Sequence, residues 1–152
     1  RNSDIILNTD FAATLADYAG VNAPACSEGR SFRDNLKGET PRDWRQSMYY
    51  RYWTHHKIRP AHMGIRGHRY KLMFLYGDPL NATGSDKAPV TPSWEFYDLL
   101  ADPHENHNLY GSPTYAGEIE KMKRELLKLR REIGDTDAAN PRMQEIMDAY
   151  YW

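Results

Sequence analysis

Four short runs rich in aromatic residues stand out in the middle of the chain. They cover residues 48–53, 63–66, 70–76 and 94–99. Glycine, proline and histidine residues separate the runs, and most connections are too short for the crossover that parallel strands require. The pattern therefore predicts a four-stranded antiparallel sheet.

The clearest helical pattern follows the last run. Ser112 and Pro113 are expected to open this helix and Gly134 to end it. Apolar residues recur in steps of four and three at Tyr115, Ile119, Met122, Leu126, Leu129 and Ile133. This stripe should lie across one face of the sheet. The charged face is expected to be solvated: Glu120, Lys121, Lys123, Arg124, Lys128, Arg131 and Glu132. Residues 141–152 predict a second short helix.

The first 20 residues predict one short helix and no strand of the sheet. Residues 11–19 predict a short helix, for which Thr9 or Asp10 could accept hydrogen bonds from the first amides. Gly20 could supply the left-handed residue that ends it. A short apolar run and one short helix have too little core of their own, so this start is expected to belong to a larger fold.

Residues 20–46 contain several glycines and prolines and no sustained period, which predicts a loop.

Composition then excludes some classes of partner. The formal net charge is -1, so no global field attracts nucleic acid or anionic lipid. No apolar run approaches the roughly 20 residues that span a bilayer. The single cysteine, Cys26, excludes an internal disulfide and a cysteine-built zinc site.

Histidines are the first candidates for chemistry, and zinc usually needs three or four ligands on rigid elements. The stretch from His104 to His107 is one residue shorter than the His-Glu-x-x-His helix motif and follows an Asp-Pro turn signal. No metal site is expected from this chain, and solvated turn histidines are the favoured interpretation. The remaining histidines crowd the first three runs: His55, His56, His62 and His68.

The segment from Arg59 to Arg66 is the second candidate. Its two arginines are permanently charged, fork-shaped donors that suit oxyanions such as sulfate or carboxylate, and His62 lies between them. The alternative is that the arginines flank an exposed edge strand and that His62 caps a turn.

Four segments resemble, in order, the C-terminal portion of sulfatases of the alkaline-phosphatase-like superfamily. The most specific is WEFYDLLADPHENHNL at residues 94–109, similar to the family pattern W-E-L-Y-D-L-x-x-D-P-x-E-x-x-N-L. Residues 10–20 and 64–72 resemble two further motifs, with Ala13 and Gly67 where proline and threonine are usual. The stretch GRSF at residues 29–32, followed by Leu-Lys-Gly, resembles the fourth.

This resemblance implies an α/β enzyme in two parts. Residues 1–46 would be the tail end of a large N-terminal catalytic domain, with its connection, and residues 47–152 a C-terminal subdomain. Within this chain the class is α+β, a four-stranded antiparallel sheet packed by a long C-terminal helix. The resemblance implies calcium and a formylglycine in the missing N-terminal domain, no cofactor in this chain, and a periplasmic or secreted protein.

Cys26 and Arg30 have the spacing of the sulfatase nucleophile motif, Cys-x-Pro-x-Arg or Cys-x-Ala-x-Arg. The third position here is Glu28, and the segment follows a helix instead of opening one. Cys26 is therefore expected to be an ordinary loop thiol.

The resemblance also suggests roles for the second candidate. His62 would contact the substrate or donate a proton to its leaving group, and Arg66 and Arg59 would bind sulfate or carboxylate groups of a sugar. The expected partners are a sulfated sugar and the protein's own N-terminal catalytic domain. Arylsulfates are possible substrates. Two alternatives remain open: a non-catalytic carbohydrate-binding or interaction module, and a phosphonate or phosphodiester hydrolase of the same superfamily.

Overall fold

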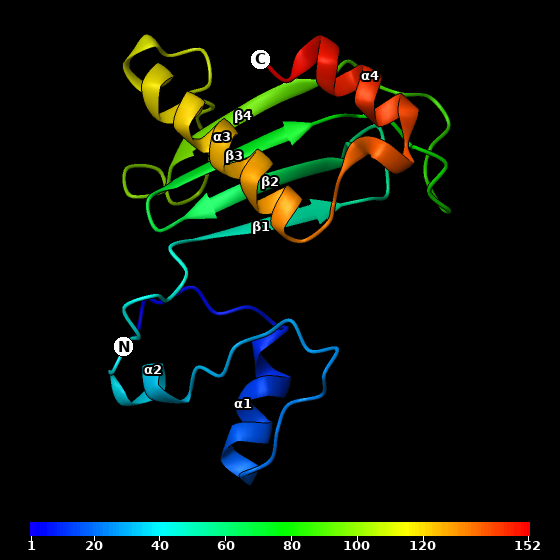
Figure 1. Ribbon diagram of the computed structural model, residues 1–152. Helices are drawn as coiled ribbons and strands as arrows, with labels where there is room; N and C mark the ends of the chain where they lie inside the picture. The colour runs from blue at the N-terminus through cyan, green and yellow to red at the C-terminus, as the bar shows by residue number, and fades with distance from the viewer. The chain divides into compact units, whose positions relative to one another are not determined.

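The structure is a computed structural model that describes residues 1–152, apart from the side chain of residue 139. The chain divides into two compact units, residues 1–47 and residues 48–152 (Figure 1). None of the helices described in either unit combines the length and the apolar character that crossing a bilayer requires.

The first unit contains α1 (Asp10–Ala19) and a short helix α2 (Arg33–Lys37) within the segment expected to be a loop. The predicted first helix is confirmed, and Gly20 ends it with a left-handed φ of 70°. The predicted cap is wrong, because Thr9 makes no capping bond through its side chain. The carboxylate of Asp10 bonds to groups outside the helix instead.

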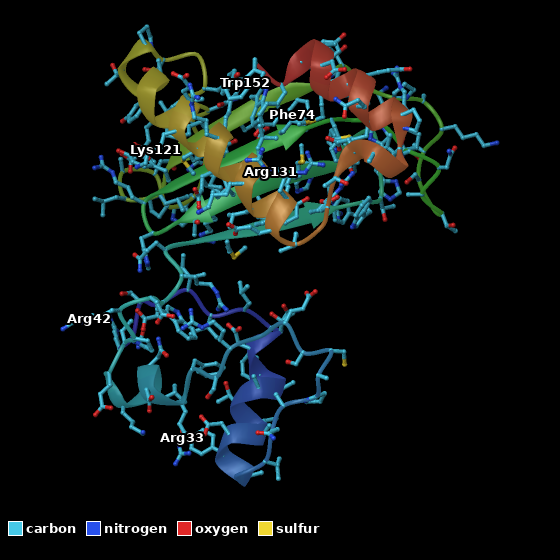
Figure 2. All side chains as sticks on the ribbon, in the orientation of Figure 1. Arg33, Arg42, Phe74, Lys121, Arg131 and Trp152 are labelled. Carbon is cyan, nitrogen blue, oxygen red and sulfur yellow. The ribbon has the colours of Figure 1, made fainter. Side chains whose placement is uncertain are left out.

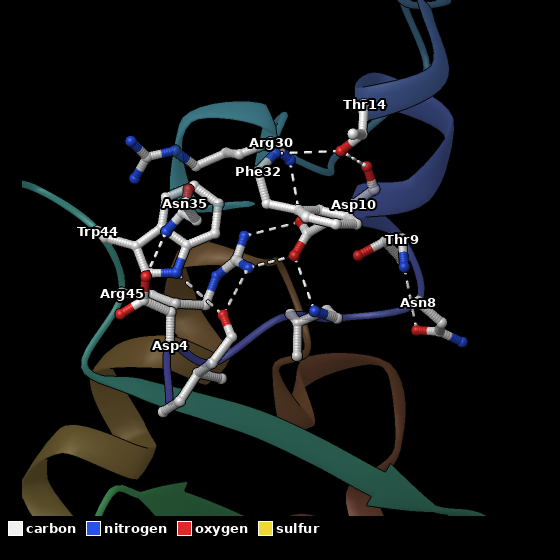
Figure 3. A network of polar contacts seen from close by, with 12 residues as sticks. Asp4, Asn8, Thr9, Asp10, Thr14, Arg30, Phe32, Asn35, Trp44 and Arg45 are labelled. Carbon is white, nitrogen blue, oxygen red and sulfur yellow. Dashed lines mark hydrogen bonds and ion pairs between the residues drawn. The ribbon is translucent and has the colours of Figure 1, made fainter. Parts of the chain in front are cut away.

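Asp10 is the centre of the first unit (Figure 3). Its buried carboxylate accepts hydrogen bonds from the backbone amides of Leu7, at 2.7 Å, and Arg30, at 2.9 Å. The guanidinium of Arg45 forms a bidentate pair with the same carboxylate. Burial raises the pKa of Asp10, but the bonds to Arg45 and the two amides outweigh it and hold the pKa below its usual value. Asp10 thus ties three segments of the chain to the start of α1.

The loop after Gly29 lies along α1. A side chain at Gly29 has no room, since a Cβ there would lie 2.0 Å from the carbonyl oxygen of Thr9. Further along, the amide of Phe32 donates to the hydroxyl of Thr14 at 3.1 Å. These contacts explain why the GRSF segment can follow the helix so closely.

The second unit is built on the predicted sheet. Its strands are adjacent in chain order: β1 (Ser47–Tyr52), β2 (His62–Gly67), β3 (Tyr70–Leu75) and β4 (Ser93–Asp98). β2, β3 and β4 pair antiparallel, with Leu72 opposite both Ile65 and Phe96. Each observed strand lies within two residues of its predicted bounds, so the prediction is confirmed.

Two helices cover one face of this sheet: α3 (Ala116–Glu132) and α4 (Pro141–Tyr150) (Figure 1). Phe74 lies between sheet and helices, whereas Lys121 and Arg131 project away from the sheet (Figure 2). The predicted stripe packs as expected through its first three turns, where Leu126 is fully buried. At the end of the stripe, Ile133 is 56% exposed.

The ends of this long helix match the prediction in part. Gly134 follows it with a φ of 74°, as expected. Ser112, however, makes no capping bond through its side chain, and the first turn, Pro113–Tyr115, is a 3-10 turn. The helical pattern therefore predicted the extent of the segment but not its first turn.

Lys123 corrects the expectation of a fully solvated charged face. Its side chain is buried between α3 and the end of the chain, and the ammonium lies 4.3 Å from the centre of the Trp94 ring. It donates to the hydroxyl of Tyr110 at 2.8 Å and to the backbone carbonyl of Tyr151 at 2.5 Å. Burial lowers the pKa of Lys123 to about 8.

Candidate functional site

The face of the sheet turned away from α3 and α4 is here called the second face. The strand register assigns its members, because side chains alternate between faces along each strand. The residues that alternate with the core residues are His62, Gly64 and Arg66 from β2, Lys71, Met73 and Leu75 from β3, and Glu95 and Tyr97 from β4. Tyr50 and Tyr52 of β1 join them through contacts with His62.

His62 begins β2 and is half-buried. Its Nδ1 lies 2.8 Å from the carbonyl oxygen of Pro60. A carbonyl only accepts, so Nδ1 carries the hydrogen and Nε2 is the atom left for another partner. The ring of Tyr52 stacks on the imidazole at 5.4 Å, with 24° between the planes, and Tyr50 meets it edge-on at 6.0 Å.

Arg59 reaches the same group of side chains from a tight turn. The turn is closed by paired backbone bonds between His56 and Arg59, at 2.9 Å and 3.1 Å. The guanidinium carbon of Arg59 lies 5.6 Å from the centre of the Tyr52 ring, and Nη1 is 3.4 Å from the Tyr52 hydroxyl. Arg59 itself is exposed, so it can still bind an anion.

Arg66 occupies a different place. It lies on the second face four residues beyond His62 along β2, a separation of roughly 13 Å at the usual rise of a strand. Of the three predicted site residues, the fold thus brings His62 and Arg59 together through Tyr52 and leaves Arg66 at the opposite end of the strand.

Polar side chains occupy the middle of the second face. The ring of Tyr50 lies directly over Gly64, where a Cβ would be 2.6 Å from the ring carbon that carries the hydroxyl. Lys71 pairs with Glu105 at 2.5 Å. The hydroxyl of Tyr97 donates to Glu95 at 3.0 Å. Burial, with the bond to Glu95, raises the pKa of Tyr97 to about 12, so it stays a neutral donor at physiological pH.

His55 corrects the expectation that the histidines of this region are solvated. It is fully buried, accepts from the amide of Ala61 at 3.3 Å through Nδ1, and lies 3.1 Å from the carbonyl oxygen of Ala88 through Nε2. With Nδ1 as the acceptor, Nε2 is the donor. His55 therefore fastens the segment before β2 to the long loop between β3 and β4.

The other candidates lie apart from these residues. Cys26 is an exposed free thiol in the first unit. His104 and His107 are exposed in the turn after β4, where the amide of His107 donates to Asp102 at 2.8 Å. Among the residues that the structure describes, no group of three or more histidine, cysteine, aspartate or glutamate side chains could hold a metal ion.

Sequence reasoning missed the tyrosines that surround His62. Tyr50 and Tyr52 are two residues apart in a predicted strand, so they were bound to share a face. What the sequence did not reveal is that this face is also that of His62, because the register between β1 and β2 is not encoded in either run alone.

Comparison with known proteins adds the family. Residues 1–132 match the family described as "N-sulphoglucosamine sulphohydrolase, C-terminal". An N-acetylglucosamine-6-O-sulfatase from Bacteroides thetaiotaomicron is 34% identical over 141 residues, 90% of this chain and 23% of that protein.

Two solved structures resemble this chain in fold. A protein in complex with its substrate D-glucosamine-2-N,6-O-disulfate superposes with a TM-score of 0.67 and 32% identity, over 86% of this chain and 25% of that one. A phosphonate monoester hydrolase from Silicibacter pomeroyi has a TM-score of 0.59 at 23% identity, over 81% of this chain and 24% of its own, which is likeness of fold alone. The chain spans about a quarter of the length of these relatives.

Proposed function

Because the chain belongs to the family of sulphohydrolase C-terminal domains, we propose that it is part of a sulfatase that hydrolyses sulfate esters of glycans. The 34% sequence identity to an N-acetylglucosamine-6-O-sulfatase is the observation that carries this proposal. In the proposed sulfatase, residues 1–46 end the catalytic domain and residues 47–152 form the C-terminal subdomain. The division into compact units at Ser47 supports that boundary.

The nucleophile belongs to another part of such an enzyme. A sulfatase of this kind uses calcium and a formylglycine, which together supply the attacking oxygen and neutralise charge on the sulfate. The described residues of this chain do not fit either group. Cys26 has Glu28 in place of the motif's proline or alanine, and there is no cluster of carboxylates suited to calcium among the side chains described. In this proposal the chain therefore contributes side chains that contact the substrate, and not the nucleophile or the calcium ligands.

His62 is the residue that we assign to the leaving group. Its Nδ1 is engaged by the carbonyl of Pro60, so the protonated ring presents Nε2–H. As the bond between sulfur and the sugar oxygen breaks, Nε2 gives its proton to that oxygen and the sugar leaves as an alcohol. Arg59, on the same tyrosine, would bind a sulfate or carboxylate group of the sugar, and Arg66 a more distant one.

The test is the substitution His62→Ala in the whole protein, assayed on a sulfated sugar and on 4-nitrophenyl sulfate. A sugar alkoxide is far more basic than 4-nitrophenolate, so protonation matters for the first and little for the second. General acid catalysis contributes about 10²–10⁴-fold. We expect kcat/KM to fall by at least about 10²-fold on the sugar and to stay within about tenfold on the aryl ester.

His68→Ala is the matched control, because His68 is an exposed histidine in the turn after the same strand. It should leave both rates unchanged. Small, equal losses for His62→Ala on both substrates would refute the role of His62, and large, equal losses would indicate damage to the sulfate pocket. Loss of the basic limb of the pH profile would separate proton donation from binding alone. Faster turnover of a phosphate diester than of any sulfate ester would refute the sulfatase assignment.

A further inference from the structure

Tyr52 contacts both His62 and Arg59, which have no polar contact with each other in the structure as described. Its ring stacks on the imidazole at 5.4 Å, and its hydroxyl and ring meet the guanidinium at 3.4 Å and 5.6 Å. Two side chains with different proposed tasks thus share one neighbour. A displacement of Tyr52 would move both.

His62 needs such a neighbour. The bond from Nδ1 to Pro60 fixes which nitrogen carries the hydrogen, but a single bond does not fix the plane of the ring. The stack with Tyr52, at 24° between the planes, and the edge contact with Tyr50 restrict rotation of the ring about that bond. The direction of Nε2 therefore depends on the tyrosines.

The backbone of Tyr52 is itself held by the core. Its carbonyl accepts a hydrogen bond from the hydroxyl of Tyr76 at 3.3 Å, and Tyr76 is only 1% exposed. Tyr52 is the last residue of β1, so this bond fixes the strand where its ladder ends. The bond therefore fixes the backbone from which the Tyr52 ring reaches His62 and Arg59.

We propose that Tyr52 is the positioning residue of this site, which aligns the imidazole of His62 and the guanidinium of Arg59 for the same sugar. This inference rests on the proposed function, since it assumes that His62 acts on the leaving group. It also specifies the substrate class: a sulfated sugar with a second anionic group, bound by Arg59 while the scissile ester lies at His62.

The experiment uses the whole protein and separates the two contacts of Tyr52. Tyr52→Phe keeps the ring and removes the hydroxyl. We expect kcat on the sulfated sugar to stay within about twofold and KM to rise about threefold to tenfold, as loss of one hydrogen bond to a charged group would cause. The rise should disappear in an Arg59→Ala background. Independent, multiplied losses from the two changes would contradict a shared role.

Tyr52→Leu removes the stack. We expect kcat/KM on the sugar to fall by about tenfold to 10²-fold, the usual effect of a misplaced catalytic group, with 4-nitrophenyl sulfate turned over at nearly the normal rate. In a His62→Ala background the same change should cost only as much as Tyr52→Phe does, about threefold to tenfold, because the imidazole it positions is gone and only the contact with Arg59 is lost. Retained turnover of the aryl ester shows that the variant is folded. If Tyr52→Leu does not fold, the comparison of Tyr52→Phe in the natural and Arg59→Ala backgrounds decides whether Tyr52 positions Arg59.

The outcomes are distinguishable. If His62→Ala has no effect on the sugar, the proposed role of His62 fails, and the inference on Tyr52 fails with it, whereas the sulfatase assignment is decided separately by the comparison of sulfate esters with a phosphate diester. If His62→Ala is slow on the sugar but Tyr52→Leu is not, or if their effects multiply, the proposed function stands and Tyr52 is not its positioning residue.

Discussion

Raising the pH should stabilise this protein through one side chain, Lys123. Burial lowers its pKa to about 8 in the folded chain, whereas an unfolded lysine has a pKa of about 10.4. Between these values the unfolded chain binds more protons at Lys123 than the folded chain does. The free energy of unfolding therefore rises with pH across this window.

The size of the effect follows from the two pKa values. At pH 7 the lysine is charged in both states and contributes almost no slope. At pH 9 it is mostly neutral in the folded chain and still charged in the unfolded one, so the free energy of unfolding should rise by about 1 kcal/mol between the two. Above about pH 10 the buried tyrosines act in the opposite direction, because burial raises the pKa of groups such as Tyr151 above that of an unfolded tyrosine.

The assay is urea unfolding at pH 7, 8 and 9, with Lys123→Met as the variant. Methionine has a similar length and no charge, and the loss of the bonds to Tyr110 and Tyr151 is common to all three pH values. The rise should be present in the natural chain and absent in Lys123→Met. Equal slopes in both proteins would refute the reasoning and would mean that the Trp94 ring and the Tyr151 carbonyl offset the cost of burying the charge.

Three further outcomes can be tested on the 152-residue chain. Leu126→Ala should lower the free energy of unfolding by about 2–5 kcal/mol, because Leu126 is fully buried. Ile133→Ala, at the exposed end of the same stripe, should lower it by less than about 0.5 kcal/mol. A loss that small for Leu126→Ala would mean that the helix is peripheral to the core. Asp10→Asn should lower the free energy of unfolding by about 3 kcal/mol, since it leaves the Arg45 charge facing a neutral amide. Asp34→Asn, in an exposed pair with Lys37, should lower it by less than about 1 kcal/mol. Similar losses for the two variants would contradict the central role of Asp10. The chain alone should release no sulfate from 4-nitrophenyl sulfate or sulfated disaccharides, and turnover abolished by Cys26→Ala would overturn this reading.

The sequence predicted the elements of the fold well because each depends on a local pattern. The aromatic runs between glycine, proline and histidine residues, and the steps of four and three before Gly134, defined the sheet and the long helix within a few residues. Lys123 was missed for the complementary reason. Its position on the helix predicts solvent, but Tyr151 returns from 28 positions further along and covers it. No local pattern reports a contact of that range.

The candidate site shows the same limit. His62 and its two arginines were selected by residue type, and the alternation of β2 puts His62 and Arg66 on one face. The separation of His62 and Arg66 follows from the rise of β2 itself, but the tyrosine that joins His62 to Arg59 depends on the pairing of β1 with β2. Buried polar residues such as Asp10 and His55 have partners that come from other segments, so neither could be identified as buried from its own surroundings.

Gly64 has a consequence for how this domain can vary between species. A side chain at position 64 would meet two neighbours: the ring of Tyr50, 2.6 Å from a Cβ, and the backbone carbonyl oxygen of Leu72, 2.8 Å from it. A smaller residue at position 50 would remove only the first of these contacts. Homologues should therefore keep glycine at position 64 whatever residue stands at position 50, and an invariant glycine in this strand would mark the place where β1 and β3 both crowd β2.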